Sequence, residues 1–267
     1  IVAEAGVNHN GKIDLAIKLI DEAAKSGADF VKFQHTNPNL ISPFAKKTKY
    51  QINNTQNSQS QKSMISKLHL DWRKAYKILI KRCKLKKIKF LTSAFSSTDY
   101  LIVDKLKLDF IKIPSGEIVN TQLLETISKS NKKILLSTGM ANIEEIKNAL
   151  KILTRQHPLT RITLLHCVSE YPTNFKDVNL QSISYLRNKF KVDVGLSDHS
   201  LGIEVPIAAI AFGAKVIEKH FTLSKKMNGP DHKASLEPDE FSSMVSKIRN
   251  IENAIGRFEK KPNKKEI

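Results

Sequence analysis

Residues 192–220 decide the fold, and they read VDVGLSDHSLGIEVPIAAIAFGAKVIEKH. Two short apolar runs, Val192–Ser197 and Lys215–His220, predict strands, and a helical pattern lies between them. A strand, a helix and a second strand predict a parallel pair joined by a crossover helix. Both runs end in polar residues, Ser197-Asp198-His199 and Glu218-Lys219-His220.

The same alternation runs through the whole chain. A turn with the G-x-G-x-x-G pattern would favour an open, doubly wound sheet, but the turn after the first run, residues 6–11, does not have it. Eight strand–helix units in 267 residues therefore predict an α/β fold, a (β/α)8 TIM barrel of eight parallel strands over residues 1–256. The six further strands are expected at Ile1–Gly6, Asp29–Gln34, Ile88–Ser93, Phe110–Pro114, Lys133–Thr138 and Ile162–Cys167, with helical spacing as in Leu15-Leu19-Ile20-Ala23 and Ile143-Ile146-Leu150-Leu153 and a last helix near Pro238–Ile255.

Composition predicts a soluble globular protein without a membrane partner. Hydrophobic residues make up 40% of the chain and the mean hydropathy is −0.30. No apolar run approaches the ~20 residues that a membrane helix needs. Because the chain starts in an apolar run without a charged leader and holds only Cys83 and Cys167, we expect no signal peptide, reduced thiols and a cytoplasmic location.

The formal net charge of +18 raises the question of nucleic-acid binding. Only seven of the 44 basic residues are Arg, the side chain that nucleic-acid recognition favours, and the lysines are spread over surface positions without interleaved aromatics. We therefore expect no nucleic-acid partner. The surplus charge would still attract an anionic substrate.

Two segments break the alternation. From His35 to about Lys62 the chain is polar with little periodicity, and a loop of this length is either an active-site lid or a disordered insertion. It follows the second strand and would lie at the carboxyl end of the barrel. Residues 257–267 are rich in Lys, Glu and Pro, and we interpret them as a linker.

Polar residues close nearly every predicted strand. Aliphatic side chains normally fill a barrel, whereas catalytic residues emerge at the carboxyl ends of its strands. Buried charges cost several kcal/mol unless they are paired, so eight polar strand ends predict a polar basin at one end of the barrel. The strand ends are Glu4, Lys32 with Gln34, Thr92-Ser93, Lys112, Ser137-Thr138, His166, Ser197-Asp198-His199, and Glu218 with His220.

His199 and His220 close neighbouring strands, where two imidazoles can reach one divalent ion. Two protein ligands would leave positions open for substrate oxygen and water, as Lewis-acid activation of a carbonyl requires. Separate structural roles for the two histidines stay open. His9 and His166 are spare candidates, and the remaining four are interpreted as loop or surface residues: His35, His69, His157 and His232.

An anion that carries both carboxylate and phosphate has candidate ligands in Lys32 and Lys112, together with the hydroxyl groups of Ser93, Ser115 and Ser137. Glu117 follows the fourth strand and could orient a water molecule or exchange a proton, or it could belong to a helix N-cap. Asp231, in Gly229-Pro230-Asp231, is either part of a plain turn or delivered to the basin.

Several motifs, in order along the chain, resemble the sialic acid synthase family, which includes N-acetylneuraminate, legionaminate and pseudaminate synthases. The details are most similar to the bacterial N-acetylneuraminate and legionaminate branches. The motifs are Ala3-Glu4-Ala5-Gly6-Val7-Asn8-His9-Asn10-Gly11, Val31-Lys32-Phe33-Gln34, Lys112-Ile113-Pro114-Ser115-Gly116-Glu117, Leu136-Ser137-Thr138-Gly139-Met140, His166-Cys167-Val168-Ser169-Glu170-Tyr171-Pro172-Thr173, Gly195-Leu196-Ser197-Asp198-His199, Glu218-Lys219-His220-Phe221 and Gly229-Pro230-Asp231-His232-Lys233-Ala234-Ser235.

The resemblance implies a barrel enzyme that joins C3 of phosphoenolpyruvate to the aldehyde of an N-acylmannosamine-type sugar. Water adds at C2, phosphate leaves through C–O cleavage, and a nonulosonic acid results. It also implies a divalent metal, Mn2+ or alternatively Mg2+, on His199 and His220. By position, Lys32, Lys112, Ser93, Ser115 and Ser137 would hold phosphoenolpyruvate, Glu4, Gln34, Glu117, Ser169, Tyr171 and Asp231 would contact the sugar, and Glu4, Glu117 and Lys112 would be catalytic.

The sequence departs from the family at three points. Ser93-Ala94-Phe95 stands where Thr-Pro-Phe is frequent, and Ser169 where some members have Asn, which concerns sugar specificity. Members usually carry a C-terminal antifreeze-like domain that completes the partner's site in a domain-swapped homodimer. We expect the linker at 257–267 to lead to such a domain, and residues 1–267 alone to bind metal and phosphoenolpyruvate but turn over poorly. A catalytically silent barrel acting as a binding or assembly subunit, and another phosphoenolpyruvate–aldose synthase, are the alternatives.

Overall fold

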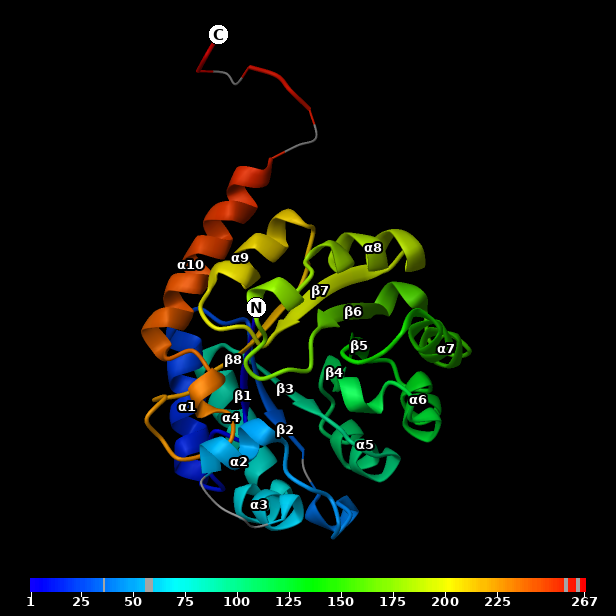
Figure 1. The fold of residues 1–267 in the computed structure, drawn as a ribbon, viewed down its shortest axis with the longest axis vertical. Helices are drawn as coiled ribbons and strands as arrows, with labels where there is room; N and C mark the ends of the chain where they lie inside the picture. The colour runs from blue at the N-terminus through cyan, green and yellow to red at the C-terminus, as the bar shows by residue number, and fades with distance from the viewer. Residues whose placement is uncertain (36, 56–59, 257–258, 263–264) are drawn as a thin grey trace.

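The computed structural model describes residues 1–35, 37–55, 60–256, 259–262 and 265–267. Eight parallel strands form a closed barrel in which each strand pairs with the next and β8 pairs with β1 (Figure 1). The prediction of a TIM barrel is confirmed. The strands are β1 (Val2–Gly6), β2 (Phe30–Gln34), β3 (Lys89–Ser93), β4 (Phe110–Ile113), β5 (Lys133–Ser137), β6 (Ile162–Cys167), β7 (Asp193–Asp198) and β8 (Ile217–His220).

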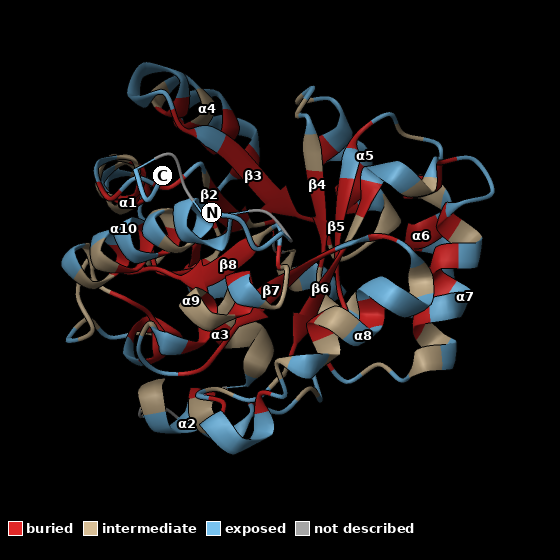
Figure 2. Ribbon diagram, turned by 90° about the horizontal axis from the view of Figure 1, so that it is seen from above, coloured by how far each residue is buried: buried red, intermediate tan, exposed pale blue. Residues whose placement is uncertain are grey.

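Helices surround the barrel, and their inward faces and the strands are buried while their outer faces are exposed (Figure 2). The predicted last helix, Pro238–Ile255, is present as α10 and packs beside α1 and α9. The helices are α1 (Ile13–Lys25), α2 (Lys49–Thr55), α3 (Gln61–Leu68), α4 (Trp72–Lys86), α5 (Ser97–Asp104), α6 (Thr121–Ser128), α7 (Ile143–Leu153), α8 (Gln181–Phe190), α9 (Glu204–Ala211) and α10, with 3-10 turns η1 (Pro38–Leu40), η2 (Ser115–Glu117), η3 (Leu159–Arg161), η4 (Phe175–Asp177) and η5 (His232–Ala234).

The interior of the barrel has an apolar layer and a polar layer. Val2, Leu91, Leu135 and Leu165 form a buried cluster inside the barrel, each two residues before a polar or thiol side chain on the same strand. Side chains two residues apart on a strand point to the same face, so the next inward positions are Glu4, Ser93, Ser137 and Cys167. The strand pattern itself therefore changes from aliphatic to polar toward the carboxyl end, as the polar strand ends predicted.

Helical structure occupies about half of the described part of the 35–62 connection. The chain forms η1 and then α2, and α3 begins at Gln61. Residues 36 and 56–59 of this connection lie outside the described residues. α2 lies against the carboxyl end of the barrel, because the side-chain amide of Asn54 donates to the carbonyl oxygen of Pro230 at 2.6 Å and the ring of Tyr50 stacks on that of Tyr171.

The chain after α10 leads away from the barrel (Figure 1). Its described residues, 256, 259–262 and 265–267, form no helix or strand. Their interpretation as a linker stays a prediction. Among the residues that the structure describes, no helix has both the length and the apolar character that crossing a membrane requires.

Candidate active site

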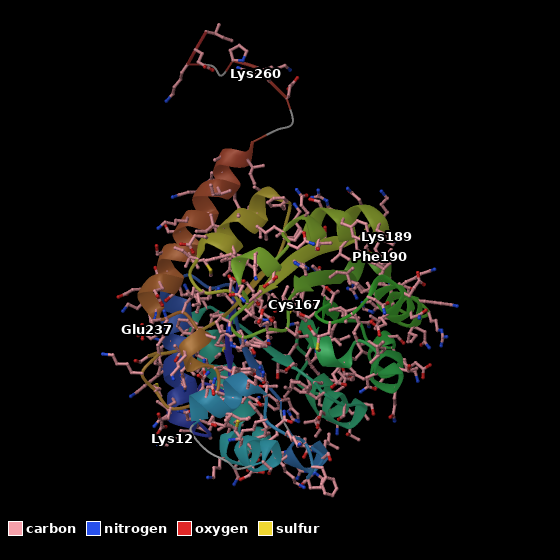
Figure 3. All side chains as sticks on the ribbon, viewed as in Figure 1. Lys12, Cys167, Lys189, Phe190, Glu237 and Lys260 are labelled. Carbon is pink, nitrogen blue, oxygen red and sulfur yellow. The ribbon has the colours of Figure 1, made fainter. Side chains whose placement is uncertain are left out.

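A cavity of about 700 Å3 opens at the carboxyl ends of the strands. Its floor is the polar layer of the barrel, and its walls come from α2, α3 and the loops after β3 to β6 and β8. Cys167, at the end of β6, lies in the middle of the barrel (Figure 3). Eleven of the thirteen predicted site residues line this cavity: Glu4, Lys32, Gln34, Lys112, Ser115, Ser137, Ser169, Tyr171, His199, His220 and Asp231.

Two lysines and two glutamates form a buried ion-pair network on the floor. Nζ of Lys32 lies 2.7 Å from Oε2 of Glu4 and 3.8 Å from Oε2 of Glu218. Nζ of Lys112 lies 2.7 Å from Oε1 of Glu218. These four side chains are at most 5% exposed, and pairing is what makes their burial tolerable. We call Glu4, Lys32, Lys112 and Glu218 the charge quartet.

Burial and neighbouring charges move the pKa values of the quartet in opposite directions. Burial raises the pKa of Glu218, but Lys112 and Lys32 outweigh it and hold that pKa at about 2. Burial dominates at Glu4 and raises the pKa of its carboxyl, although Lys32 partly compensates. Burial would lower the pKa of Lys32, but Glu218 and Glu4 raise it above its ordinary value. The quartet therefore keeps Glu218 ionised and Lys32 available as a cation.

The two predicted metal ligands lie side by side above the quartet. The ring centroids of His199 and His220 are 5.6 Å apart, and the ring of Tyr171 lies 4.0 Å from that of His199. Nδ1 of His199 is 2.6 Å from the carbonyl oxygen of Val168, so Nδ1 carries the proton that is donated. Burial and the proximity of His199 hold the pKa of His220 well below its ordinary value, which makes His220 neutral.

This histidine pair fits a divalent metal ion. Neutral imidazole is a common metal ligand, and a carbonyl that accepts from Nδ1 of His199 directs Nε2 of that ring toward a ligand. Nδ1 of His220 is buried without a hydrogen-bond partner in the described chain, as expected for a group that awaits a ligand. The described residues hold no cluster of three or more His, Cys, Asp or Glu side chains placed to bind a metal.

Hydroxyl groups gather beside the quartet around Gly139, where an added Cβ would displace two of them. A Cβ on Gly139 would collide with Oγ of Ser169 and would lie 2.8 Å from Oγ of Ser115. The amide of Gly139 donates to Oγ of Ser115 at 3.1 Å. Oγ of Ser137 is buried without a partner in the described chain and is free to donate to a ligand.

Two predicted site residues do not line the cavity. Ser93 is paired in register with Lys112, and its hydroxyl is buried without a partner in the described chain. Glu117 lies in η2, where its carboxylate accepts from the side-chain amide of Asn120 at 2.7 Å. The structure therefore places Glu117 beside the site, with its carboxylate engaged by a neighbouring turn.

Asp231 enters the cavity from the loop after β8. Burial, with the nearby Glu4, raises its pKa to about 7. His232 supports this loop, because its Nδ1 is 2.7 Å from Oγ1 of Thr222. Of the two readings of residues 229–231, the structure supports the one in which the loop delivers Asp231 to the basin.

Comparison with known proteins identifies the family. A model of the NeuB family matches residues 19–260. The N,N'-diacetyllegionaminic acid synthase of Campylobacter jejuni is 53% identical over the whole chain, which covers 80% of that protein. The enzyme of the same name from Legionella pneumophila is 40% identical over the whole chain, which covers 76% of it.

The chain belongs to the NeuB family. A crystal structure of the N-acetylneuraminic acid synthetase of Leptospira borgpetersenii superimposes on it with a TM-score of 0.85 at 33% identity, covering 99% of this chain and 87% of that one. The expected resemblance and the enzyme class, a nonulosonic acid synthase, are thereby confirmed.

Sequence reasoning missed several residues of this NeuB site. Glu218 was predicted together with His220 at the end of the eighth strand, but not as the link between the two lysines. Cys167 was not predicted as a site residue, although it closes the predicted strand Ile162–Cys167. Its Sγ lies 3.8 Å from Nδ1 of His199; burial raises the pKa of this thiol, but His199 and Lys112 more than offset that and lower it. Tyr50 was not predicted as a site residue, because the sequence of residues 35–62 shows no clear helical pattern.

The other histidines lie outside the NeuB cavity. His9 packs against Phe33 and Trp72, and Nε2 of His166 is 2.6 Å from the carbonyl oxygen of Val178. Both side chains contribute to packing, so neither of these alternative metal-ligand candidates lies in the site. The remaining histidines were predicted to be loop or surface residues: His35 and His157 do lie in loops, although both are buried, and His232 is buried in η5.

Proposed function

We propose that this chain condenses phosphoenolpyruvate with an N-acylmannosamine-type sugar, with metal assistance, to give a nonulosonic acid and phosphate. The more specific proposal is a sugar with two acetamido groups and a product of the diacetyllegionaminic acid type. Its support is the 53% identity to a synthase of that product. The observation that carries the general reaction is the charge quartet beside the histidine pair.

The quartet supports anion binding because its lysines keep unused donors. An ammonium group has three N–H donors. Lys112 uses one of its donors in the hydrogen bond to Glu218, and Lys32 forms ion pairs with Glu4 and Glu218. The remaining donors, with the hydroxyl groups of Ser115, Ser137 and Ser93, suit the carboxylate and phosphate of phosphoenolpyruvate. Glu218 would hold both ammonium groups in position.

His199 and His220 would hold the divalent metal, Mn2+ or Mg2+. When bound, it supplies Lewis-acid polarisation of the sugar aldehyde. His220 contributes by staying neutral, and His199 by directing its Nδ1 proton to Val168. Tyr171 packs on the ring of His199 and would exclude water from this side of the reacting carbon.

In the proposed reaction a bond forms between C3 of phosphoenolpyruvate and the aldehyde carbon of the sugar. The aldehyde oxygen takes up a proton, water adds at C2, and the C2–O bond to phosphate breaks. Asp231 suits the proton donor, since a carboxyl group with a pKa of about 7 is partly protonated at neutral pH. Glu4 and Glu117 are the other proposed acid–base groups. Glu117 would act on the water molecule that adds at C2.

The sugar would lie between the quartet and α2. Gln34 donates to Oε1 of Glu4 at 2.9 Å, which turns its own carbonyl toward a ligand hydroxyl or amide. Ser169, Tyr171 and Asp231 face the same space. We also propose that residues 257–267 link the barrel to a C-terminal domain, that the enzyme is a homodimer through it, and that it works in the cytoplasm.

A phosphate-release assay over a panel of mannosamine derivatives tests this function. The panel comprises mannose, N-acetylmannosamine and a 2,4-diacetamido-6-deoxy mannose, each with phosphoenolpyruvate and Mn2+. The proposal predicts fastest release with the diacetamido sugar and none with mannose. Release that does not depend on any acylamino sugar would contradict it.

A further inference from the structure

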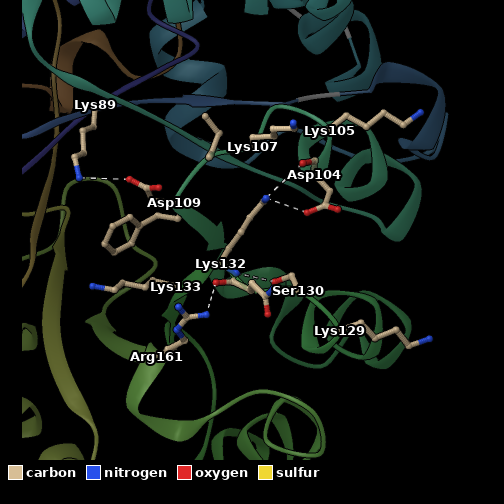
Figure 4. Close-up of a pocket in the computed structure, with 13 residues that line it drawn as sticks. Lys89, Asp104, Lys105, Lys107, Asp109, Lys129, Ser130, Lys132, Lys133 and Arg161 are labelled. Carbon is tan, nitrogen blue, oxygen red and sulfur yellow. Dashed lines mark hydrogen bonds and ion pairs between the residues drawn. The ribbon is translucent and has the colours of Figure 1, made fainter.

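A second hollow, opposite the active site, opens between the amino ends of the strands from β3 to β6 (Figure 4). Its volume is about 700 Å3. Thirteen residues line it, of which seven are Lys or Arg and two are Asp. Basic residues are 44 of 267 in the whole chain, about one in six, so their share here exceeds what composition explains.

The two carboxylates of this hollow are already paired. Nζ of Lys132 lies 3.0 Å from Oδ1 of Asp104, and Nζ of Lys89 lies 3.5 Å from Oδ2 of Asp109. The other five basic side chains have no carboxylate partner among the described residues. They are Lys105, Lys107, Lys129, Lys133 and Arg161.

The arrangement of these cations favours an extended ligand. The amino group of Lys133 extends to one side of the hollow, as does that of the paired Lys89, and those of Lys105 and Lys129 extend to the other, with Arg161 nearer to Lys133 (Figure 4). The guanidinium of Arg161 is held by a 2.6 Å bond to the carbonyl oxygen of Asn131. A single phosphate would reach only part of this array, whereas linked phosphates could bridge it.

The aromatic residue of the hollow is not free to stack on a base. Nζ of Lys133 lies 5.4 Å from the centroid of the Phe110 ring, and Phe30 meets the same ring edge-on at 5.1 Å. Recognition of nucleic acids relies on exposed aromatic faces and on base edges. The hollow therefore offers charge for phosphates and little for bases.

We propose that this hollow binds a small polyphosphate-type anion, meaning two or more linked phosphate groups, either free or carried by a nucleotide. The volume is that of a small-molecule site, and lysine is a normal point-charge ligand for phosphate. Catalytic residues of a barrel lie at the opposite end, so the site is separate from the reaction proposed above. A bound anion stabilises the fold because it relieves repulsion among unpaired cations.

Titration calorimetry of the full-length protein with tripolyphosphate tests this site. Lys129→Ala/Lys133→Ala removes two unpaired cations, and we expect roughly tenfold weaker binding. Lys129→Arg/Lys133→Arg keeps the charge and should keep binding. Lys18→Ala/Lys151→Ala, on the exposed faces of α1 and α7, changes the net charge equally and should have no effect. Thermal unfolding of each variant checks that it folds.

Comparing different anions shows whether linked phosphates, a nucleotide or a single phosphate accounts for the binding. ATP should bind about as well as tripolyphosphate, inorganic phosphate more weakly, and excess phosphoenolpyruvate should displace neither. Four results would overturn the proposal: no saturable binding, equal loss in both alanine pairs, displacement by phosphoenolpyruvate, or tighter binding of a single-stranded oligonucleotide at the same lysines.

Discussion

The ring of Tyr50 stacks on the ring of Tyr171 with 4.8 Å between centroids, and this contact joins α2 to the active site. Tyr171 in turn lies against His199. The helix that covers the cavity is therefore coupled to a proposed metal ligand through two aromatic rings.

Replacing Tyr50 with Ala should weaken closure of α2 over the sugar. An aromatic pair contributes about 0.5–1.5 kcal/mol, so we expect KM for the sugar to rise roughly two- to tenfold. Tyr50→Phe keeps the ring and is the matched control. Steady-state kinetics with the sugar varied measure the effect, and equal KM values for the Ala and Phe variants would argue against a role in closure.

Replacing Glu218 with Gln should destabilise the barrel and weaken binding of phosphoenolpyruvate. Loss of one partner of a buried ion pair costs about 3–5 kcal/mol, and here Lys112 would lose its carboxylate. Ser197→Ala is the control, because it removes only the 2.9 Å hydroxyl bond to the same carboxylate oxygen. Chemical denaturation and KM for phosphoenolpyruvate are the readouts. A Gln variant no worse than the Ser197 variant would contradict the quartet's role.

Gly139→Ala should impair substrate binding, because the new Cβ would meet the hydroxyl groups of Ser169 and Ser115. We expect the free energy of unfolding to change little, since hydroxyl groups can rotate aside, and KM to rise roughly tenfold through their misplacement. Gly116→Ala is the control, because nothing lies within 4 Å of a Cβ there. Kinetics that do not distinguish the two variants would show that the close approach at Gly139 is irrelevant to binding.

The buried carboxyl group of Asp231 should make stability depend on pH. Its pKa rises from 3.8 to about 7, so the folded state favours the protonated form. The stabilisation is fully present below pH ~4 and is lost as pH rises toward 7. The difference between a pKa of 3.8 and one of about 7 sets an upper limit of ~4 kcal/mol.

Asp231→Asn should remove this dependence. Denaturation at pH 5 and pH 8, with a chelator present, should show that the variant gains stability relative to the wild-type protein at the higher pH. Parallel pH profiles for the two proteins would refute this pKa shift.

The fold could be predicted from the sequence because each strand corresponds to a short apolar run. All eight strands lie within two residues of their predicted bounds, and Ile162–Cys167 matches at both ends. Lys32 with Gln34 and Glu218 with His220 were also predicted as polar strand ends, and these four side chains line the cavity. These are local properties of the chain, and parallel crossover geometry then leaves few ways to arrange the strands.

The contacts between distant residues could not be predicted in this way. Glu218 links Lys32 to Lys112 across the barrel, which no spacing along the chain reveals. Glu117 follows a strand like the true lining residues, yet a turn with Asn120 holds its carboxylate. α2 is held by Tyr171 and Pro230, so its tertiary contacts favour a helix that local periodicity does not indicate.

Oxygen labelling tests the central claim most directly. Phosphoenolpyruvate with 18O at the oxygen that bridges C2 and phosphorus is incubated with the full-length enzyme, Mn2+ and a diacetamido mannose, and both products are analysed by mass spectrometry. We predict sugar-dependent release in which the label stays with phosphate and the organic product is a nine-carbon acid. Label in the organic product, or release without sugar, would contradict the proposed reaction.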